Sequence, residues 1–248
     1  MEKGIYNQIL ANAKQGKKML ACLIDPDKVH ENEIAKLINQ TKNTIITHIF
    51  VGGSIVENNK TETIVKAIKK NTELPVLLFP GDYTHLTNTA DGLLFLSLLS
   101  GRNPEYLIEQ QVKSIPFLKK STLEIISTGY LLVDGGKVSS VQKVSNTQPL
   151  ALQQETIINT ALAGAYMGSK LIYLEAGSGA NISIPIEIIA AVKKVLRIPL
   201  IVGGGIKSIT QLQNIFNAGA DVVVIGTAFE KDDTLYNSLK QSQLFINE

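Results

Sequence analysis

Short apolar runs alternate with helical patterns along the whole chain. The runs are rich in Val, Ile and Leu, which is typical of strands that are buried on both faces. They predict eight strands, at Met19–Ile24, Ile45–Val51, Pro75–Phe79, Gly92–Leu96, Glu124–Val133, Lys170–Leu174, Pro199–Val202 and Asp221–Ile225. Apolar positions with helical spacing precede or follow most of these runs. They predict helices at Ile5–Lys14, Glu33–Gln40, Ile55–Lys70, Ala151–Tyr166, Pro185–Leu196, Ile209–Ala218 and Asp232–Gln241, and one more that starts at Pro104.

The spacing of the strands predicts one closed barrel. Strand and helix alternate about every 25 to 30 residues, as in a series of βαβ units. The chain has 248 residues, close to the ~250 of a (β/α)₈ barrel. A doubly wound sheet would need an early Gly-x-Gly-x-x-Gly turn, which the sequence lacks. We therefore expect a single α/β domain over residues 1–248, a (β/α)₈ TIM barrel with parallel strands, in which residues 134–148 form a long loop with some hairpin character.

Composition and charge narrow the class of protein. The net charge is only +2 and basic residues are scattered among acidic ones, which gives no reason to expect a nucleic-acid partner. The one cysteine, Cys22, excludes an internal disulfide framework and fits a reducing cytosol. The start of the sequence has no apolar signal core, and no run approaches the ~18 apolar residues of a spanning helix. We expect a soluble, cytoplasmic protein, with transient contact with a membrane surface left open.

Two glycine-capped strand ends near the C-terminus predict a phosphate site. Gly203, Gly204 and Gly205 follow the seventh strand, and Ser208 stands where a helix N-cap belongs. Gly226-Thr227 follows the eighth strand in the same way. In (β/α)₈ barrels the loops after strands seven and eight frequently bind phosphate. The alternative is a pair of tight turns without a ligand.

Polar residues follow the first two strands. Asp25 and Asp27 come directly after the first strand, and Ser54 follows the second. Mg²⁺ commonly takes one or two carboxylates together with phosphate oxygens, so these residues are candidate metal ligands. Alternatively, Asp25 and Asp27 cap the next helix. On spacing alone the two readings are equally supported.

Glu175 lies between the sixth strand and a Gly-Ser-Gly turn. A carboxylate repels phosphate, so Glu175 is a candidate for binding or deprotonating a substrate hydroxyl, while Gly177 and Gly179 offer backbone donors to the phosphate. The alternative is that Glu175 caps a helix or braces the loop. Tyr173 lies two residues earlier, where its ring points either into the barrel mouth or into the core.

Six blocks along nearly the whole chain carry a family resemblance. They are Leu23-Ile-Asp-Pro-Asp-Lys28, Val51-Gly-Gly-Ser54, Leu78-Phe-Pro-Gly81, Tyr173-Leu-Glu-Ala-Gly-Ser-Gly179, Val202-Gly-Gly-Gly-Ile206 and Ile225-Gly-Thr227. Together they resemble the geranylgeranylglyceryl phosphate synthase family, which includes the bacterial PcrB-like proteins. The stretch Ser100-Gly-Arg-Asn-Pro104 is similar to the second of the family's two groups.

The resemblance implies a prenyltransferase. It would join sn-glycerol 1-phosphate to a polyprenyl diphosphate, with geranylgeranyl diphosphate as the expected donor, and release diphosphate with the help of Mg²⁺. Asp25 and Ser54 would hold the metal, and a homo-oligomer is expected. One departure is Leu23, where some members carry a lysine. By the same match, glycerol 1-phosphate would contact Tyr173, Leu174, Glu175, Ala176, Gly177, Ser178, Gly179, Gly204, Gly205, Gly226 and Thr227, with Glu175 and Tyr173 as catalytic residues.

Other functions share the phosphate site. A phosphosugar isomerase or aldolase-like barrel would need a Schiff-base lysine or an acid/base pair, and Lys28 is the only lysine at a strand end. A non-catalytic barrel that binds a phosphate ligand is a further alternative. A prenyl tail would need an apolar groove, because each buried CH₂ contributes about 0.8 kcal/mol. Its expected walls are Phe79, Tyr83, Leu98, Leu99 and Tyr106.

Overall fold

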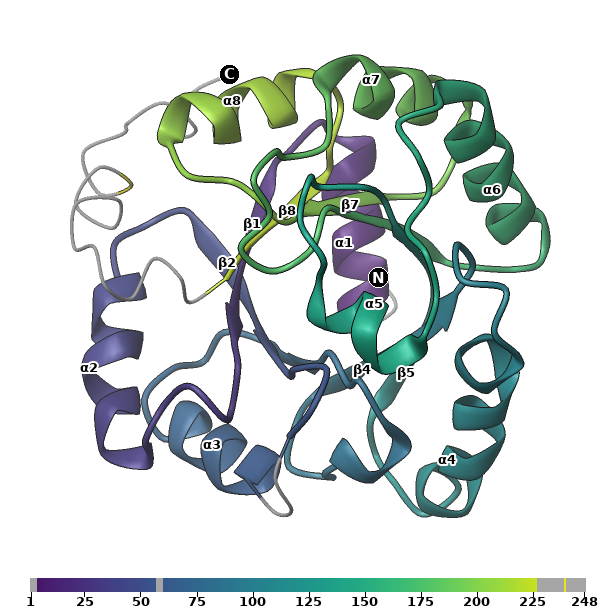
Figure 1. The fold of residues 1–248 in the computed structure, drawn as a ribbon. Helices are drawn as coiled ribbons and strands as arrows, with labels where there is room; N and C mark the ends of the chain where they lie inside the picture. Colours follow the sequence, from purple (N-terminus) through teal and green to yellow (C-terminus); the bar gives the residue numbers. More distant parts are fainter. Residues whose placement is uncertain (1–3, 57–59, 227–238, 240–248) are drawn as a thin grey trace.

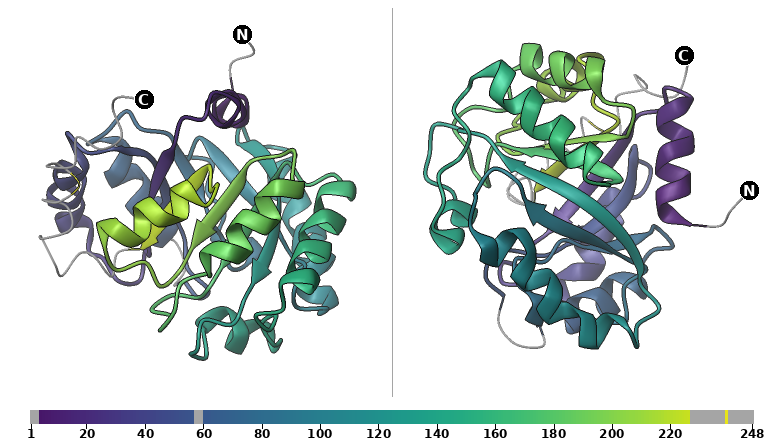
Figure 2. Two further views of the ribbon diagram at one scale, coloured as in Figure 1. Left: turned by 90° about the horizontal axis from the view of Figure 1, so that it is seen from above. Right: turned by 90° about the vertical axis from the view of Figure 1, so that its right-hand side faces the viewer.

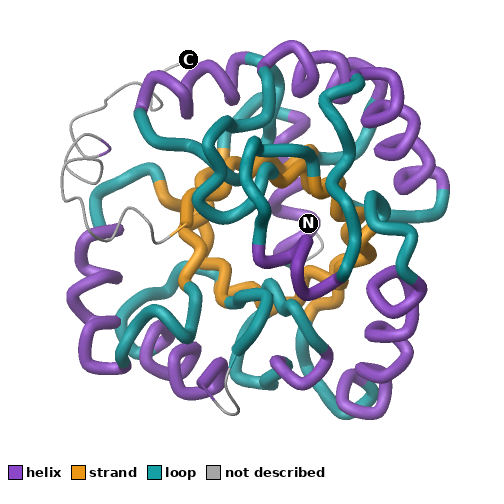
Figure 3. Tube along the Cα trace, in the orientation of Figure 1, coloured by secondary structure: helices purple, strands orange, loops and turns teal. Residues whose placement is uncertain are grey.

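The chain folds into a closed barrel of parallel strands, surrounded by helices. This is a computed structural model, and it describes residues 4–56, 60–226 and 239. The eight strands pair in sequence order, and β8 pairs with β1 to close the barrel. Figure 3 shows the ring of strands inside the ring of helices. The predicted (β/α)₈ barrel is therefore confirmed (Figure 1).

The strand bounds lie within a residue or two of the predicted ones. The strands are β1 (Met19–Ile24), β2 (Ile46–Val51), β3 (Val76–Leu78), β4 (Gly92–Leu98), β5 (Glu124–Leu132), β6 (Leu171–Glu175), β7 (Leu200–Gly203) and β8 (Val222–Gly226). Their side chains are almost all buried, because the inner face fills the barrel and the outer face packs on helices.

Most of the helices lie on the outside of the barrel. The α-helices are α1 (Ile5–Lys14), α2 (Glu31–Thr41), α3 (Lys60–Lys69), α4 (Gln110–Leu118), α5 (Ser140–Ser145), α6 (Gln154–Tyr166), α7 (Ile186–Val195) and α8 (Ile209–Asn217). A 3₁₀ turn, η1 (Tyr83–His85), and a π-helical turn, η2 (Glu105–Glu109), precede α4. In the described part of the chain no helix is long and apolar enough to cross a membrane.

The two ends of the barrel are covered differently. Helix α1 lies across the end where the strands begin, with Ile5 and Ile9 packed into the barrel interior. The backbone N–H groups of Ile5 and Tyr6 donate to the carboxylate of Glu124, which fixes the start of this helix. Helix α5 lies at the opposite end, as the right-hand view of Figure 2 shows. The first opening is therefore closed, and ligands must enter at the end where α5 lies.

Two sequence predictions need revision, and a third lies almost wholly outside the described residues. Residues 134–148 contain the helix α5, which Ser139 caps by accepting from the Gln142 N–H, so the prediction of a hairpin-like loop was wrong. Helix α3 begins at Lys60, not at Ile55. The predicted helix at 232–241 lies outside the described residues except for Leu239, which is helical and buried.

Candidate active site

The predicted site residues lie at the end of the barrel where the parallel strands finish. Each of β1, β2, β3, β6 and β7 is followed there by a short polar or glycine-rich stretch, and β8 ends there at Gly226. Active sites of (β/α)₈ enzymes lie on this face, because neighbouring strand ends bring distant segments together. The described site has two halves, one after β6–β8 and one after β1–β3.

The loop after β7 lies directly against the end of β6. Gly204 and Gly205 have positive φ angles of 85° and 69°, which side chains other than glycine rarely adopt. A Cβ on Gly204 would stand 2.4 Å from Oε1 of Glu175 and 2.8 Å from the amide nitrogen of Gly177. The two loops are thus packed against each other beside Glu175. Ser208 caps α8 as predicted, by accepting from the N–H of Gln211.

Gly226 ends β8 beside open space. A Cβ built on it meets no atom within 4 Å, so nothing in the described fold requires a glycine there. Close approach of a ligand is one reason for a glycine at such a position. The neighbouring Thr227, predicted to contact the same ligand, lies outside the described residues.

Glu175 is a buried carboxylate held at the bottom of this region. It is only 7% exposed, and its Oε1 accepts the N–H of Gly177 at 2.8 Å. Burial raises the pKa of Glu175, while the nearby Tyr173 hydroxyl and the Gly177 N–H oppose the rise. A carboxylate with a raised pKa is a better proton acceptor than an ordinary one. The geometry therefore suits contact with a hydroxyl.

Tyr173 projects into the barrel interior, one of the two orientations predicted. Its side chain is fully buried, and its hydroxyl and Glu175 Oε2 both lie close to Gly203, at 2.5 and 2.7 Å from the position of an added Cβ. The Tyr173 hydroxyl lowers the pKa of the Glu175 carboxyl group. Its distances and angles to the described groups nevertheless fall outside those of a regular hydrogen bond. Burial, followed by the charge of Glu175, raises the pKa of Tyr173 well above its usual value. Tyr173 is thus a protonated donor that lies beside Glu175.

An aromatic cluster connects the two halves of the site. The ring of Phe79 lies 5.4 Å from that of Tyr173 and 5.8 Å from that of Tyr130, and the two tyrosine rings are 5.3 Å apart. Sequence reasoning missed Tyr130, which lies within β5. Its place on the strand, with the ring directed inward by alternation, was the available signal.

Asp25 and Ser54 form the other half of the site. A Cβ on Gly53 would stand 2.9 Å from Oδ1 of Asp25, so the β2 loop lies against this carboxylate. Oδ1 of Asp25 accepts the N–H of Asp27 at 3.1 Å, and Oδ2 pairs with Nζ of Lys28 at 2.8 Å. Neither aspartate caps α2, because His30 is its N-cap and Glu33 completes a capping box. The helix-capping alternative is therefore excluded.

The donor set at Asp25 fits a cation that is shared with a ligand. No cluster of three or more His, Cys, Asp or Glu side chains with metal-binding geometry occurs among the described residues. One carboxylate and one hydroxyl leave most coordination positions to water and substrate oxygens, which is the usual arrangement for Mg²⁺. The Asp25 side chain is 18% exposed and remains accessible to such a ligand.

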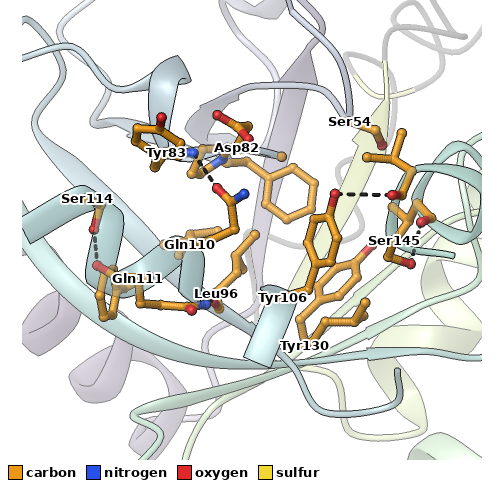
Figure 4. A pocket seen from close by; sticks show the side chains of 18 of the residues that line it. Ser54, Asp82, Tyr83, Leu96, Tyr106, Gln110, Gln111, Ser114, Tyr130 and Ser145 are labelled. Carbon is orange, nitrogen blue, oxygen red and sulfur yellow. Dashed lines mark hydrogen bonds between the residues drawn. The ribbon is translucent and has the colours of Figure 1, made fainter. Parts of the chain in front are cut away.

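An apolar pocket opens beside Ser54 and runs between β4 and α4. Figure 4 shows Tyr106 and Tyr130 near its centre and Gln111 and Ser114 on the α4 side. The Tyr106 hydroxyl donates to the carbonyl of Val144, which ties η2 to α5. Its empty space, with the open mouth included, is about 800 Å³. Four of the five predicted groove residues line it: Phe79, Tyr83, Leu98 and Tyr106.

Leu99 does not line this pocket, so this part of the prediction was wrong. Its Cδ1 lies close to Gly129 of β5 and Gly164 of α6, at 2.8 and 2.4 Å from the positions of added Cβ atoms. Side chains of neighbouring residues in a strand point to opposite faces, and Leu98 takes the inner one. Val141 and Val144 of α5 line the pocket instead, and were missed because their segment was predicted as a loop.

Comparison with known proteins identifies the family. The sequence signature of the PcrB family matches residues 13–243. The chain belongs to the PcrB family. It is 50% identical over 235 residues to the geranylgeranylglyceryl phosphate synthase of Flavobacterium johnsoniae, which covers 94% of this chain and 97% of that protein. The synthase of the same name from Zunongwangia profunda is 54% identical over 230 residues, or 92% and 98% of the two chains.

A solved structure extends the match to three dimensions. This PcrB family member is similar to the crystal structure of (S)-3-O-geranylgeranylglyceryl phosphate synthase from Thermoplasma acidophilum, which holds the substrate sn-glycerol-1-phosphate. The TM-score is 0.89 at 32% identity, and the match covers 96% of each chain. Fold and sequence thus agree on the same family.

Proposed function

We propose that this protein is a prenyltransferase that joins sn-glycerol 1-phosphate to a polyprenyl diphosphate, with geranylgeranyl diphosphate as the expected donor. The observation that carries the proposal is the contact between the two halves of the site. The apolar pocket ends at Phe79, whose ring stacks on Tyr173 beside Glu175 and the glycine loops. A long apolar substrate and a small phosphate ester would therefore meet at this cluster.

Sn-glycerol 1-phosphate would bind at the loops after β6, β7 and β8. The glycine-rich backbone at 177–179, 204–205 and 226 suits the phosphate, because glycines allow close approach of the backbone. The buried Glu175 repels phosphate and instead suits the glycerol hydroxyls. The Tyr173 hydroxyl, which is not held in a hydrogen bond of good geometry, supplies a donor for the same substrate. The relative from Thermoplasma acidophilum, whose structure holds this substrate, supports the assignment.

The reaction would be a displacement at the allylic carbon. The oxygen of the glycerol 3-hydroxyl forms a bond to C1 of the prenyl chain, the bond from C1 to the diphosphate oxygen breaks, and diphosphate leaves with the electron pair. Glu175 would orient the attacking hydroxyl and accept its proton. Burial of the site keeps water from competing as the nucleophile.

Asp25 and Ser54 would hold Mg²⁺ against the diphosphate. The cation, when bound, neutralises negative charge on the leaving group. Asp25 must release Lys28 to accept a metal, since the ammonium group occupies Oδ2 in this structure. Ser54 lines the apolar pocket and follows Gly53, which lies against the Asp25 carboxylate; this place suits the junction of the diphosphate with its tail.

We further propose a cytoplasmic homo-oligomer that contacts a membrane surface transiently. The prenyl diphosphate and the ether product are both amphiphilic, and the pocket for the prenyl chain is lined in part by residues of α4, on the outside of the barrel. Light scattering of the purified protein tests the oligomer, and co-sedimentation with vesicles that contain the prenyl diphosphate tests the membrane contact.

One incubation separates the proposed function from its alternatives. The protein is mixed with sn-glycerol 1-phosphate, geranylgeranyl diphosphate and Mg²⁺, and lipids are analysed by mass spectrometry. The ether-linked prenylglyceryl phosphate is the expected product. Conversion of a phosphosugar without any prenyl donor would instead indicate an isomerase or aldolase. Tight binding of glycerol phosphate with no turnover of any prenyl diphosphate would indicate a binding protein.

A further inference from the structure

Asn181 ties together two of the loops at the phosphate end and touches a third. Its backbone N–H donates to the carbonyl of Gly135 at 3.0 Å, and its side-chain amide donates to that of Gly136 at 2.8 Å. Its own carbonyl accepts from Nζ of Lys207 at 3.4 Å. The loop after β5 is thereby fastened onto the loop after β6, with the loop after β7 beside them.

Lys137 lies at the tip of the fastened β5 loop. Its Nζ is 3.8 Å from the position of a Cβ on Gly179, the last glycine of the Gly177-Ser178-Gly179 turn. Within residues 4–56, 60–226 and 239, this ammonium group makes no hydrogen bond or ion pair. Its loop is nevertheless held in place, because Gly135 packs on the carbonyl of Ala176 and accepts two N–H groups of the β6 loop.

The phosphate end has backbone donors but little formal positive charge. Glu175, the titratable group closest to the glycine loops, is an acid. Lys207 already donates to Asn181. A phosphate monoester carries a charge of about −1.5 to −2 at pH 7, and cationic side chains form its strongest hydrogen bonds. Lys137 is the nearby cation that has no partner in the described structure.

We propose that Lys137 binds the phosphate of the glycerol phosphate substrate, across the turn that contains Gly179. This inference rests on the proposed function for the identity of the substrate. Lys137 supplies the formal charge, and the glycine N–H groups supply the directed hydrogen bonds. The residue therefore determines affinity for the phosphate ester and leaves the prenyl pocket unaffected.

The test is calorimetric titration of sn-glycerol 1-phosphate and, separately, of inorganic phosphate into wild-type protein and three variants. Lys137→Met should weaken both affinities about tenfold at low salt, and Lys137→Arg should restore most of the loss. Lys194→Met is the matched control: it removes the same charge from the last turn of α7, at the opposite end of the barrel, and should bind as wild type. The difference between wild type and Lys137→Met should shrink at high salt, because the Debye length falls to about 3 Å at 1 M.

The outcomes separate this inference from the proposed function. Wild-type affinity in a folded Lys137→Met protein would overturn the role of Lys137 and leave the prenyltransferase intact. Equal weakening in Lys194→Met would also overturn it, because the effect would then be one of net charge. Lys137-dependent binding of inorganic phosphate without binding of glycerol 1-phosphate would support Lys137 and contradict the proposed substrate. Failure of the wild type to bind either anion would overturn both.

Discussion

The ring of Phe79 stacks on the ring of Tyr173, with centroids 5.4 Å apart and an interplanar angle of 26°. Phe79 is a wall of the apolar pocket, and Tyr173 lies next to Glu175 at the glycine loops. The stack is therefore the boundary between the space for a prenyl tail and the space for glycerol phosphate. Two substrates that approach from opposite sides of it would bring their reactive ends together.

Glu175→Gln should lower kcat by a factor on the order of 10²–10⁴, the usual contribution of a general base. The amide cannot accept the proton of the glycerol hydroxyl, but it retains an oxygen for the Gly177 N–H. The dissociation constant of glycerol 1-phosphate, measured by calorimetry, should change much less than kcat. Equal losses in both quantities would point to a structural role for Glu175.

The same variant should be more stable than wild type at neutral and alkaline pH. Burial raises the pKa of Glu175, so the ionised carboxylate costs stability once the pH exceeds the folded-state pKa. The stabilising contribution of the protonated form is present below the unfolded-state pKa and is lost as pH rises through the raised value. Melting temperatures of wild type and Glu175→Gln should converge toward acid pH. A constant difference across pH would assign the effect to something other than ionisation.

Gly226→Ala should weaken glycerol 1-phosphate binding in a protein that folds normally. The added methyl group meets no atom of the described residues within 4 Å, so a loss of affinity would indicate contact with the ligand. Gly204→Val is the comparison variant: it should raise the KM for glycerol 1-phosphate and also lower stability, because its Cβ would clash with Glu175. Kinetics of both variants measure the effect on substrate binding, and melting curves measure the effect on stability. Unaltered affinity in Gly226→Ala would place the phosphate elsewhere.

Leu98→Trp should shift the preference toward shorter prenyl diphosphates. Leu98 lines the apolar pocket, so a larger side chain there removes space for the tail. The measurement compares kcat/KM for geranyl, farnesyl and geranylgeranyl diphosphates, with Val195→Trp at the far end of α7 as a control. Glycerol 1-phosphate binding should be spared. The same ranking of donors in wild type and an active Leu98→Trp protein would put the tail outside this pocket.

Asp25→Asn should reduce activity severely and leave the fold intact. The carboxylate is partly exposed and does not cap α2, so its role in stability is small. Calorimetric titration of Mg²⁺ in the presence of diphosphate should show weaker metal binding in the variant, since a neutral amide is a poorer ligand than a carboxylate. Turnover close to wild type with the same Mg²⁺ requirement would contradict the assignment.

The hydrophobic pattern predicted the barrel because each strand is a continuous apolar run and each outer helix has an apolar stripe. The end of each apolar run also predicted where each strand ends. Asp25, Glu175 and the glycines could therefore be assigned to the strand ends. Helix α5 was not predicted, because a helix of six residues with polar neighbours is too short to show a clear helical period of apolar positions. Leu99 was misplaced because an apolar run does not say which side faces inward. The aromatic cluster depends on contacts among β3, β5 and β6, and no local pattern encodes these.

A crystal structure with both ligands tests the central claim most directly. The protein would be crystallised with sn-glycerol 1-phosphate, Mg²⁺ and a thiolodiphosphate analogue of geranylgeranyl diphosphate that does not react. The account predicts the glycerol 3-hydroxyl oxygen within about 3.5 Å of C1 of the prenyl chain, which is the range for near-attack geometry, with Glu175 on the hydroxyl and the tail between Phe79 and Leu98. Ligands held on separate faces of the barrel, or a tail outside this pocket, would contradict it.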